Sequence, residues 1–402
     1  MAWELWKLGT VCSFENGDRG KNYPSKSKFV DSGVPFVNAG HLDNAKIQLS
    51  EMNYITEEHF ELLSRGKFFN GDILFCLRGS LGKCAIVNDL EQGAIASSLV
   101  ILRPNEPLNS QFLLYYLQSP LCHQMIQKYK GGAAQPNLGA KDLEKFLVPI
   151  PDLSTQKEVV KKLNKAFADI EQARANTEQN LQNARELFDS YLQQVFSERG
   201  DGWKKTTLNE LCTKFEYGTS SKSSQEGEVP VIRMGNIQDG RIVMDKLVYS
   251  LNEEDNQKYH LNFNDVLFNR TNSAELVGKT AIYKSEERAI FAGYLIRIHR
   301  NEKLLNADYL NFYLNSPIAR KYGEQVMSQS TNQANISGTK LKTYPISIPV
   351  SLEEQQSIVE KISTLKEKVE ELEATHKSKL AALDELKQSL LQQAFTGQLT
   401  QG

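Results

Sequence analysis

The chain repeats itself over almost its whole length, and this repeat limits the folds open to it. QPNLGAKDLEKFLVPIP, from Gln135 to Pro151, returns as QANISGTKLKTYPISIP, from Gln333 to Pro349. In the same order, VPFVNAGHL, GDILF, GKCAIV and NSQFLLYYLQSP return as VPVIRMGNI, NDVLF, GKTAIY and NADYLNFYLNSP, at offsets of about 193 to 201 residues. So many matches in one order indicate two copies of a single structural unit.

Each copy begins with a segment of mixed secondary structure. VPFVNAG, DILFCL, CAIV and SLVILR are short runs of β-branched and aromatic residues between turn residues, which predicts short strands. SQFLLYYLQSP and ADYLNFYLNSP predict short helices that stop before a proline. We therefore expect two similar mixed α/β (α+β) globular domains, at residues 1–150 and 200–350.

Each copy ends in a long polar segment, and we expect long helices at residues 151–199 and 351–402. Between the proline that closes each globular segment and the final Phe, neither contains Pro or Gly. Apolar residues recur at alternating spacings of four and three, which indicates a coiled-coil seam. The expected seam is Val159, Leu163, Ala166, Ile170, Ala173, Thr177, Asn180, Ala184, Leu187 and Tyr191 in the first helix, and Ile358, Ile362, Leu365, Val369, Leu372, His376, Lys379, Leu383, Leu386 and Leu390 in the second.

We expect these two helices to pair as an antiparallel coiled coil that separates the two globular domains. A local two-fold relation would then connect the two copies. The alternative is that the helices pack in an ordinary bundle. About 40 helical residues span roughly 60 Å, so the pair could act as a spacer.

Composition excludes several protein classes. The formal net charge is -2 over 402 residues, so bulk charge does not announce a strongly basic nucleic-acid binder. No apolar run reaches the length of about 18 residues that a membrane span needs, and the first residues do not form a signal peptide. The five cysteines form no C-x-x-C pair and the six histidines no H-x-x-x-H pair. We expect a cytoplasmic protein that contacts no membrane and holds no metal.

The sequence also lacks recognisable catalytic motifs. SAELVGKT, from Ser273 to Thr280, resembles a phosphate-binding loop, but its first glycine is missing and the strand-like AIYK follows it. DELK, from Asp384, has nuclease-like spacing but lies on the expected coiled-coil helix. No G-x-S-x-G, H-E-x-x-H or G-x-G-x-x-G occurs. We therefore expect a binding scaffold without catalytic or cofactor-binding residues; a fused enzyme with an unrecognised motif stays open as an alternative.

The order of these features resembles the specificity (S) subunit of type I restriction–modification enzymes. The resemblance rests on Trp-x-x-x-x-Leu-x-x-Val/Leu-Cys at the start of each copy, and on VPFVNAGHL/VPVIRMGNI, GDILF/NDVLF and YYLQSP/FYLNSP. QPNL/QANI before VPIP/ISIP, the helix openings STQKEVVKKL/EEQQSIVEKI and the closing AFTGQLT complete it. It covers essentially the whole chain. No single motif is specific, but their order is.

The resemblance implies a function. Each globular domain would be a target-recognition domain that reads one half of a bipartite, asymmetric site on double-stranded DNA. The helices would act as a ruler and as docking surfaces for two modification (methyltransferase) subunits, which would carry S-adenosylmethionine. ATP-dependent restriction subunits would join them. The rival interpretation is a two-headed scaffold that bridges two protein partners without touching DNA.

Candidate DNA contacts lie in polar loops that differ between the two copies. Phosphate contacts call for Lys and Arg, and base edges for Arg, Asn, Gln and Ser. The candidates are Arg78, Ser80, Lys83, Lys128, Lys130, Gln135 and Asn137 in the first copy, and Asn269, Arg270, Asn272, Ser273, Lys279, Gln329, Ser330, Thr331, Asn332, Gln333 and Asn335 in the second. The alternative is that these residues are merely solvated. Gln135/Gln333 and Asn137/Asn335 recur in both copies, which favours a turn role at least as much as base reading. Arg78 and Arg270 follow the GDILF/NDVLF strands, so we expect them in parallel loops.

Overall fold

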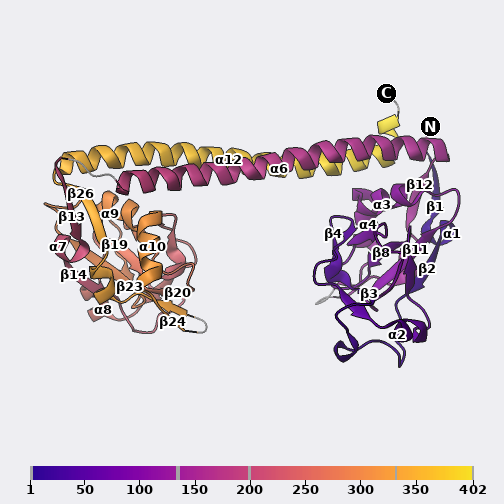
Figure 1. Ribbon diagram of the computed structural model, residues 1–402, viewed down its shortest axis with the longest axis horizontal. Coiled ribbons are helices and arrows are strands. Elements are labelled where there is room, and N and C mark those ends of the chain that lie inside the picture. Colours follow the sequence, from indigo (N-terminus) through magenta and orange to yellow (C-terminus); the bar gives the residue numbers. More distant parts are fainter. Residues whose placement is uncertain (1–2, 133–135, 198–200, 331–332, 401–402) are drawn as a thin grey trace. The chain divides into compact units, whose positions relative to one another are not determined.

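The computed structural model describes residues 3–132, 136–197, 201–330 and 333–400. The chain forms two compact units (Figure 1). Unit 1 comprises residues 1–177 and 378–402, and unit 2 comprises residues 178–377. We call the β-rich part of unit 1 before the first long helix head 1, and the β-rich part of unit 2 between the long helices head 2. No described helix is long and apolar enough to cross a membrane.

Head 1 is a mixed α+β domain built on two four-stranded sheets. Its strands are β1 (Glu4–Lys7), β2 (Cys12–Asn16), β3 (Val34–Val37), β4 (Leu42–Asp43), β5 (Lys46–Ile47), β6 (Asn53–Ile55), β7 (Lys67–Phe69), β8 (Ile73–Cys76), β9 (Cys84–Ile86), β10 (Gln92–Ile95), β11 (Leu99–Pro104) and β12 (Leu147–Ile150). Its α-helices are α1 (Leu8–Val11), α2 (Glu57–Leu62), α3 (Ser110–Gln118), α4 (Pro120–Tyr129) and α5 (Ala140–Leu143). The sheet orders are β2-β11-β8-β9 and β6-β3-β10-β7, and β1 pairs with β12.

Head 2 repeats this plan in the second copy of the sequence. Its strands are β13 (Trp203–Thr207), β14 (Cys212–Tyr217), β15 (Val229–Ile232), β16 (Ile237–Gln238), β17 (Arg241–Ile242), β18 (Val248–Ser250), β19 (Val266–Asn269), β20 (Thr271–Asn272), β21 (Thr280–Ile282), β22 (Ile290–Phe291), β23 (Leu295–Arg300), β24 (Ser328–Ser330), β25 (Gln333–Asn335) and β26 (Pro345–Pro349). Its α-helices are α7 (Leu208–Leu211), α8 (Glu253–Lys258), α9 (Ala307–Leu314), α10 (Pro317–Val326) and α11 (Gly338–Lys342). The sheet orders are β14-β23-β19-β21-β17-β16, β18-β15-β22 and β20-β25-β24, and β13 pairs with β26.

Two long helices, α6 (Leu153–Ser197) and α12 (Leu352–Phe395), follow the two heads in sequence. Each helix contributes to both units, because the unit boundary falls within it. In unit 1, Glu171 pairs with Lys387, and in unit 2, Arg185 pairs with Glu373. The partner number falls as the α6 number rises, so the helices run antiparallel, as predicted.

A buried glutamine near the start of each long helix fixes it to the preceding head. Gln156 accepts a hydrogen bond from the Asn109 N–H (2.9 Å) and donates to the Pro107 and Pro151 carbonyls. Gln355 accepts from the Asn306 N–H (2.8 Å) and donates to two carbonyls at the matching positions. Both glutamines are fully buried, so each one satisfies backbone groups that water cannot reach.

An aromatic residue at the end of each long helix enters the core of one unit. Phe395 of α12 lies against Phe112 of head 1, with ring centroids 5.0 Å apart. Phe196 of α6 lies in the same way against Tyr309 of head 2, at 5.2 Å. Each unit's hydrophobic core therefore contains residues of its head and of both long helices.

Three predicted seam leucines are exposed. Leu187 has 59% of its surface exposed, and Leu372 and Leu386 have 47%. An α-helix of 3.6 residues per turn drifts relative to a seven-residue repeat. In addition, the buried side of each helix faces its head as well as the other helix: Val159 and Leu163 lie in the core of head 1. The prediction that these three leucines lie in a buried seam is therefore wrong. The other predicted apolar seam residues are buried or partly buried.

Candidate nucleic-acid interface

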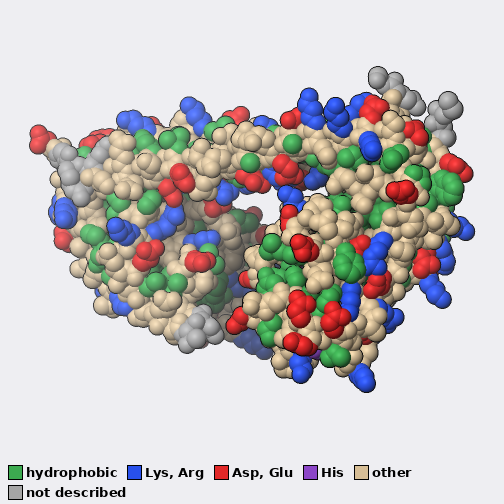
Figure 2. Space-filling model, turned by 45° about the vertical axis from the view of Figure 1, so that its right-hand side comes forward, with side chains coloured by type: hydrophobic (Ala, Val, Ile, Leu, Met, Phe, Trp, Pro, Cys, Tyr) green, Lys and Arg blue, Asp and Glu red, His purple; other side chains and the backbone are tan. Residues whose placement is uncertain are grey.

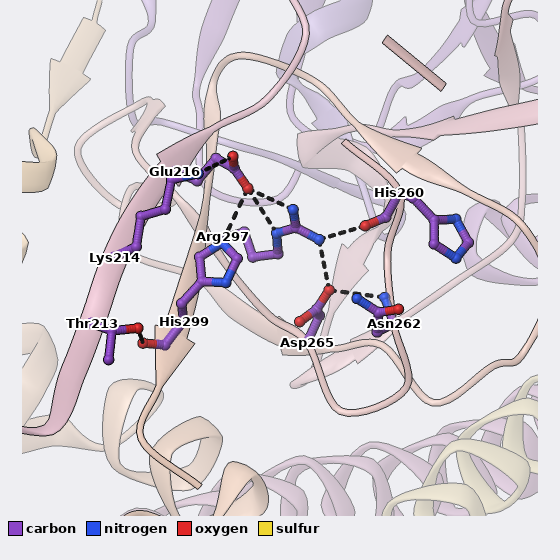
Figure 3. A network of polar contacts seen from close by, with 8 residues as sticks. All are labelled: Thr213, Lys214, Glu216, His260, Asn262, Asp265, Arg297 and His299. Carbon is purple, nitrogen blue, oxygen red and sulfur yellow. Dashed lines mark hydrogen bonds and ion pairs between the residues drawn. The ribbon is translucent and has the colours of Figure 1, made fainter. Parts of the chain in front are cut away.

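A buried ion network holds the central sheet of head 2 (Figure 3). Arg297 on β23 donates to Glu216 on β14 and, at 3.0 Å, to Asp265 before β19. Burial alone would raise the pKa of the Glu216 carboxyl, but hydrogen bonds from Lys214, Arg297 and His299 lower it to about 2. The network therefore connects β23 to both of its neighbours in the sheet, β14 and β19.

Head 1 contains a network of the same residue types, but its arginine lies two positions further along its strand than Arg297 does in head 2. Arg103 on β11 donates to Glu15 on β2 and, at 3.0 Å, to Asp72 before β8. Arg103 is more exposed than Arg297, with 31% against 6% of its side chain accessible. Because the same three residue types support β8 and β19, the segments that follow these two strands start from similar backbone frameworks.

In head 1, the segment after β8 pairs with the repeated Gln-x-Asn segment. Arg78 forms a β-bridge with Asn137, and the Leu138 N–H donates to the Leu77 carbonyl (2.9 Å). Asn137 also exchanges two backbone hydrogen bonds with Gly131, at the end of α4. The structure thus brings Arg78 and Asn137 together, with Lys130 beside Gly131 in the chain.

In head 2, the equivalent segments form the small sheet β20-β25-β24. Thr271 pairs with Asn335, whose side-chain amide donates to the Thr271 hydroxyl (2.7 Å). The Ile336 N–H donates to the Arg270 carbonyl (2.9 Å). Exposed Gln329 and Gln333 extend from β24 and β25. The hydrogen bond to Thr271 gives Asn335 a structural role in the turn.

The backbone pairing shows that Arg78 and Arg270 are not equivalent residues. The Leu77 and Arg270 carbonyls accept from the matching Leu138 and Ile336 N–H groups, so Arg270 stands where head 1 has Leu77. Arg78 corresponds instead to Thr271. The two arginines lie in parallel segments, as expected, but one residue out of register, and successive residues of a strand point to opposite faces.

Arg270 is held in position by an aromatic ring. Its guanidinium carbon lies 4.9 Å from the centroid of the Tyr217 ring, and Tyr217 is 41% exposed. Among the described residues, the buried Nε of Arg270 has no hydrogen-bond partner. A stacked, partly unsatisfied guanidinium suits bidentate recognition of a base edge or a phosphate. Tyr217 was not among the predicted site residues; its signal is an exposed aromatic residue at the end of β14.

The remaining predicted residues are distributed as follows. Ser80, Lys83, Lys128, Lys130, Ser273 and Ser330 are exposed, and Asn272 and Lys279 are partly buried. Asn269 is fully buried and its backbone bonds to Gly278 and Lys279, so it holds the neck of a loop and cannot reach a base in this arrangement. Gln135 and Asn332, together with Thr331, lie outside the described residues.

Charge on the surface is mixed. On the face drawn in Figure 2, Lys and Arg are interspersed with Asp and Glu. Locally the heads differ, because α11 carries Lys340 and Lys342 where the aligned turn of head 1 has Asp142 and Glu144. These lysines were not among the predicted DNA contacts, since they lie on a short helix outside the loops considered.

The comparison with known families decides the assignment. The model of the type I restriction modification DNA specificity domain matches residues 2–179 and 200–382. The chain belongs to this family. It is 23% identical to the EcoKI specificity subunit of Escherichia coli K12 over 99% of this chain and 89% of that protein, and 24% identical to the StySPI specificity subunit of Salmonella potsdam with the same coverage.

Solved structures share the fold. A chain from a study of complex assembly and conformational transition of the type I R-M system matches with a TM-score of 0.79, 22% identity and coverage of 99% of this chain and 98% of that one. The HsdS subunit of Thermoanaerobacter tengcongensis matches with a TM-score of 0.56, 21% identity and coverage of 99% and 97%. The family assignment agrees with the predicted role as a non-catalytic DNA specificity subunit and does not favour a scaffold that ignores DNA.

Proposed function

We propose that head 1 and head 2 each read one half of a bipartite, asymmetric DNA target through the segments that follow β8 and β19. One observation carries this proposal: ion networks of the same three residue types support both strands, while the residues that follow the strands differ. At the position of Leu77 in head 1, head 2 has Arg270, which stacks on Tyr217. At the position of Arg78, head 2 has Thr271. To read two different half-sites, the two heads need different side chains held by a similar backbone framework.

The proposal is tested by removing the two arginines separately. In the assembled methyltransferase, Arg78→Ala and Arg270→Ala should each weaken binding to the cognate DNA. Loss of one phosphate contact lowers the slope of log affinity against log salt by about one, whereas loss of a base contact costs about 1–3 kcal/mol at one position. Lys303→Ala, an exposed lysine in the loop before α9, is the charge-loss control. Unchanged affinity and an unchanged salt slope in both arginine variants would contradict the proposal.

We also propose that the α6–α12 pair holds two modification subunits, which carry S-adenosylmethionine, and that restriction subunits join the complex in the cytoplasm. Exposed Leu187 of unit 2 and exposed Leu386 of unit 1 support this, because they are the same position of the repeat. Two copies of one partner need two equivalent surfaces.

The docking surfaces are tested with charged substitutions. Leu187→Asp and Leu386→Asp should each reduce the number of bound modification subunits from two to one, measured by native mass spectrometry of the complex. Leu251→Asp, at a strongly exposed leucine of head 2, should leave two bound. Two subunits bound to both helix variants would contradict these docking surfaces.

The helix pair is further proposed to set the gap between the half-sites. Removing residues 177–183 together with 376–382 deletes one matched heptad from each helix. The methylated sequence of a folded variant should then show a changed gap, since seven helical residues span about 10 Å, which is about three base pairs. An unaltered gap would contradict the proposal that the helix pair sets the distance between the half-sites.

A further inference from the structure

The ion pairs between α6 and α12 follow one antiparallel register. Arg174 pairs with Asp384 in unit 1, and Arg185 pairs with Glu373 (2.7 Å) in unit 2. From Arg174 to Arg185 is 11 positions forward along α6, and from Asp384 to Glu373 is 11 positions back along α12. Both pairs therefore belong to the same alignment of the two helices.

The sequence repeat relates these two ion pairs to each other with reversed charges. An offset of 199 residues carries Arg174 to Glu373 and Arg185 to Asp384. Both positions are arginine in α6, and both are acidic in α12. A simple duplication would have placed the same charge at corresponding positions, which would have made each helix repel its own duplicate.

At their ends, the two helices make equivalent contacts. α6 ends in Gln-Gln-Val-Phe and α12 in Gln-Gln-Ala-Phe, and Phe196 and Phe395 enter equivalent aromatic sites. Gln156 and Gln355 make the same three hydrogen bonds. The contacts at the helix ends would therefore accept a second α6 where α12 belongs.

We propose that these four charges select α6–α12 pairing and exclude pairing of α6 with the α6 of a second chain. In such a homotypic pair, Arg185 of one copy would stand where Asp384 stands, opposite Arg174 of the other. Two repulsive arginine–arginine contacts would then replace the two ion pairs. Repulsion between like charges across a helix interface disfavours the wrong partner. In an α12 homotypic pair, Glu373 would face Asp384, while Glu370 would face Lys387 and offset part of this repulsion. The discrimination therefore resides mainly in α6.

Exposed ion pairs contribute little to stability, so the device acts on the choice of partner. It favours pairing of α6 with the α12 of the same chain over pairing with the α6 of another chain. This inference concerns pairing alone and stands apart from the proposed reading of DNA.

The double variant R185E/E373R tests it on the intact chain. Both ion pairs within the chain are kept, one in reversed orientation, but each helix now carries one charge of each sign and complements its own duplicate. Asn180→Cys serves as reporter in a chain whose five native cysteines are replaced by alanine, because a homotypic α6 pair in this register brings residue 180 of two chains together. Each variant is unfolded, refolded at high protein concentration and oxidised, and disulfide-linked dimer is quantified by non-reducing electrophoresis.

We expect at least tenfold more linked dimer for R185E/E373R than for the parent. R174E/D384R should behave like R185E/E373R, which keeps the test intact if one double variant fails to fold. The quadruple variant R174E/R185E/E373R/D384R reverses every charge, restores repulsion within each helix type and should return to the parent level. Equal dimer yields in the parent and the folded double variants would overturn the proposal, as would a high yield in the quadruple variant.

Discussion

Head 1 and head 2 share several framework contacts and differ in the segments that follow β8 and β19. Arg103 and Arg297 each join a glutamate and an aspartate of their own head, and Gln156 and Gln355 make the same three hydrogen bonds. In contrast, Leu77 is replaced by Arg270 at one aligned backbone position. The comparison teaches that what recurs in both heads is framework. Recognition is to be sought among the residues that the frame holds in place but that differ.

The largest expected effect breaks the network in head 2. Arg297→Met removes the buried cation between Glu216 and Asp265, leaving Glu216 with only Lys214 and His299. This should destabilise head 2 by about 3–5 kcal/mol. Arg103→Met should cost head 1 only about 1–3 kcal/mol, because Arg103 and Glu15 are partly exposed to water. Hydrogen exchange measured by mass spectrometry reports each head separately. Equal losses in both heads would show that the difference in burial does not matter.

Acid should also distinguish the heads. The pKa of Glu216 is lowered to about 2 from its ordinary value of 4.5, so its contribution of roughly 2–3 kcal/mol is fully present above about pH 4.5. It is lost as pH falls from there through 2. Hydrogen exchange of head 2 between pH 5 and pH 2.5 should show this loss, and Glu216→Gln should remove most of the pH dependence. A wild-type profile in that variant would assign the acid sensitivity elsewhere.

The glutamine anchors provide the matched comparison. Gln156→Ala and Gln355→Ala each leave a buried N–H and two carbonyls without partners, and each should cost about 1–3 kcal/mol. The two losses should agree with each other, because the three contacts are the same. Local hydrogen exchange at the N-termini of α6 and α12 measures both, and a clear inequality would mean that the anchors are not equivalent.

The smallest effect concerns a compensated pair of core residues. Head 1 has Ile126 and Phe146 where head 2 has Gly323 and Tyr344. A Cβ on Gly323 would lie 2.7 Å from the Tyr344 hydroxyl oxygen. Gly323→Ala should therefore gain nothing in the parent, although Ala is favoured over Gly in helices by about 1 kcal/mol. In a Tyr344→Phe background, Gly323→Ala should recover that gain in thermal unfolding; no difference between backgrounds would refute the clash.

Much of this architecture follows from the sequence. The repeat predicted two α+β heads, and the Pro- and Gly-free segments predicted the antiparallel helices. The two carboxylates of the network could have been noticed, since Glu15/Glu216 and Asp72/Asp265 recur at aligned positions in or beside apolar strands, whereas the two arginines come from positions that do not align. Heptad counting placed Leu187 in a seam because it considers only a helix partner, whereas each helix also packs on a head. The one-residue offset between Arg78 and Arg270 could not be read from loop sequences, because backbone pairing with the Gln-x-Asn segment fixes the register.

The central claim is that the two heads read different half-sites. Sequencing of methylated adenines in cells that express this chain with its modification subunits tests it most directly. The account predicts methylation within one bipartite sequence whose halves differ and are separated by a fixed gap, and Arg270→Ala should relax only one half. Methylation that does not depend on this chain, or that falls in a single continuous or palindromic sequence, would contradict the account.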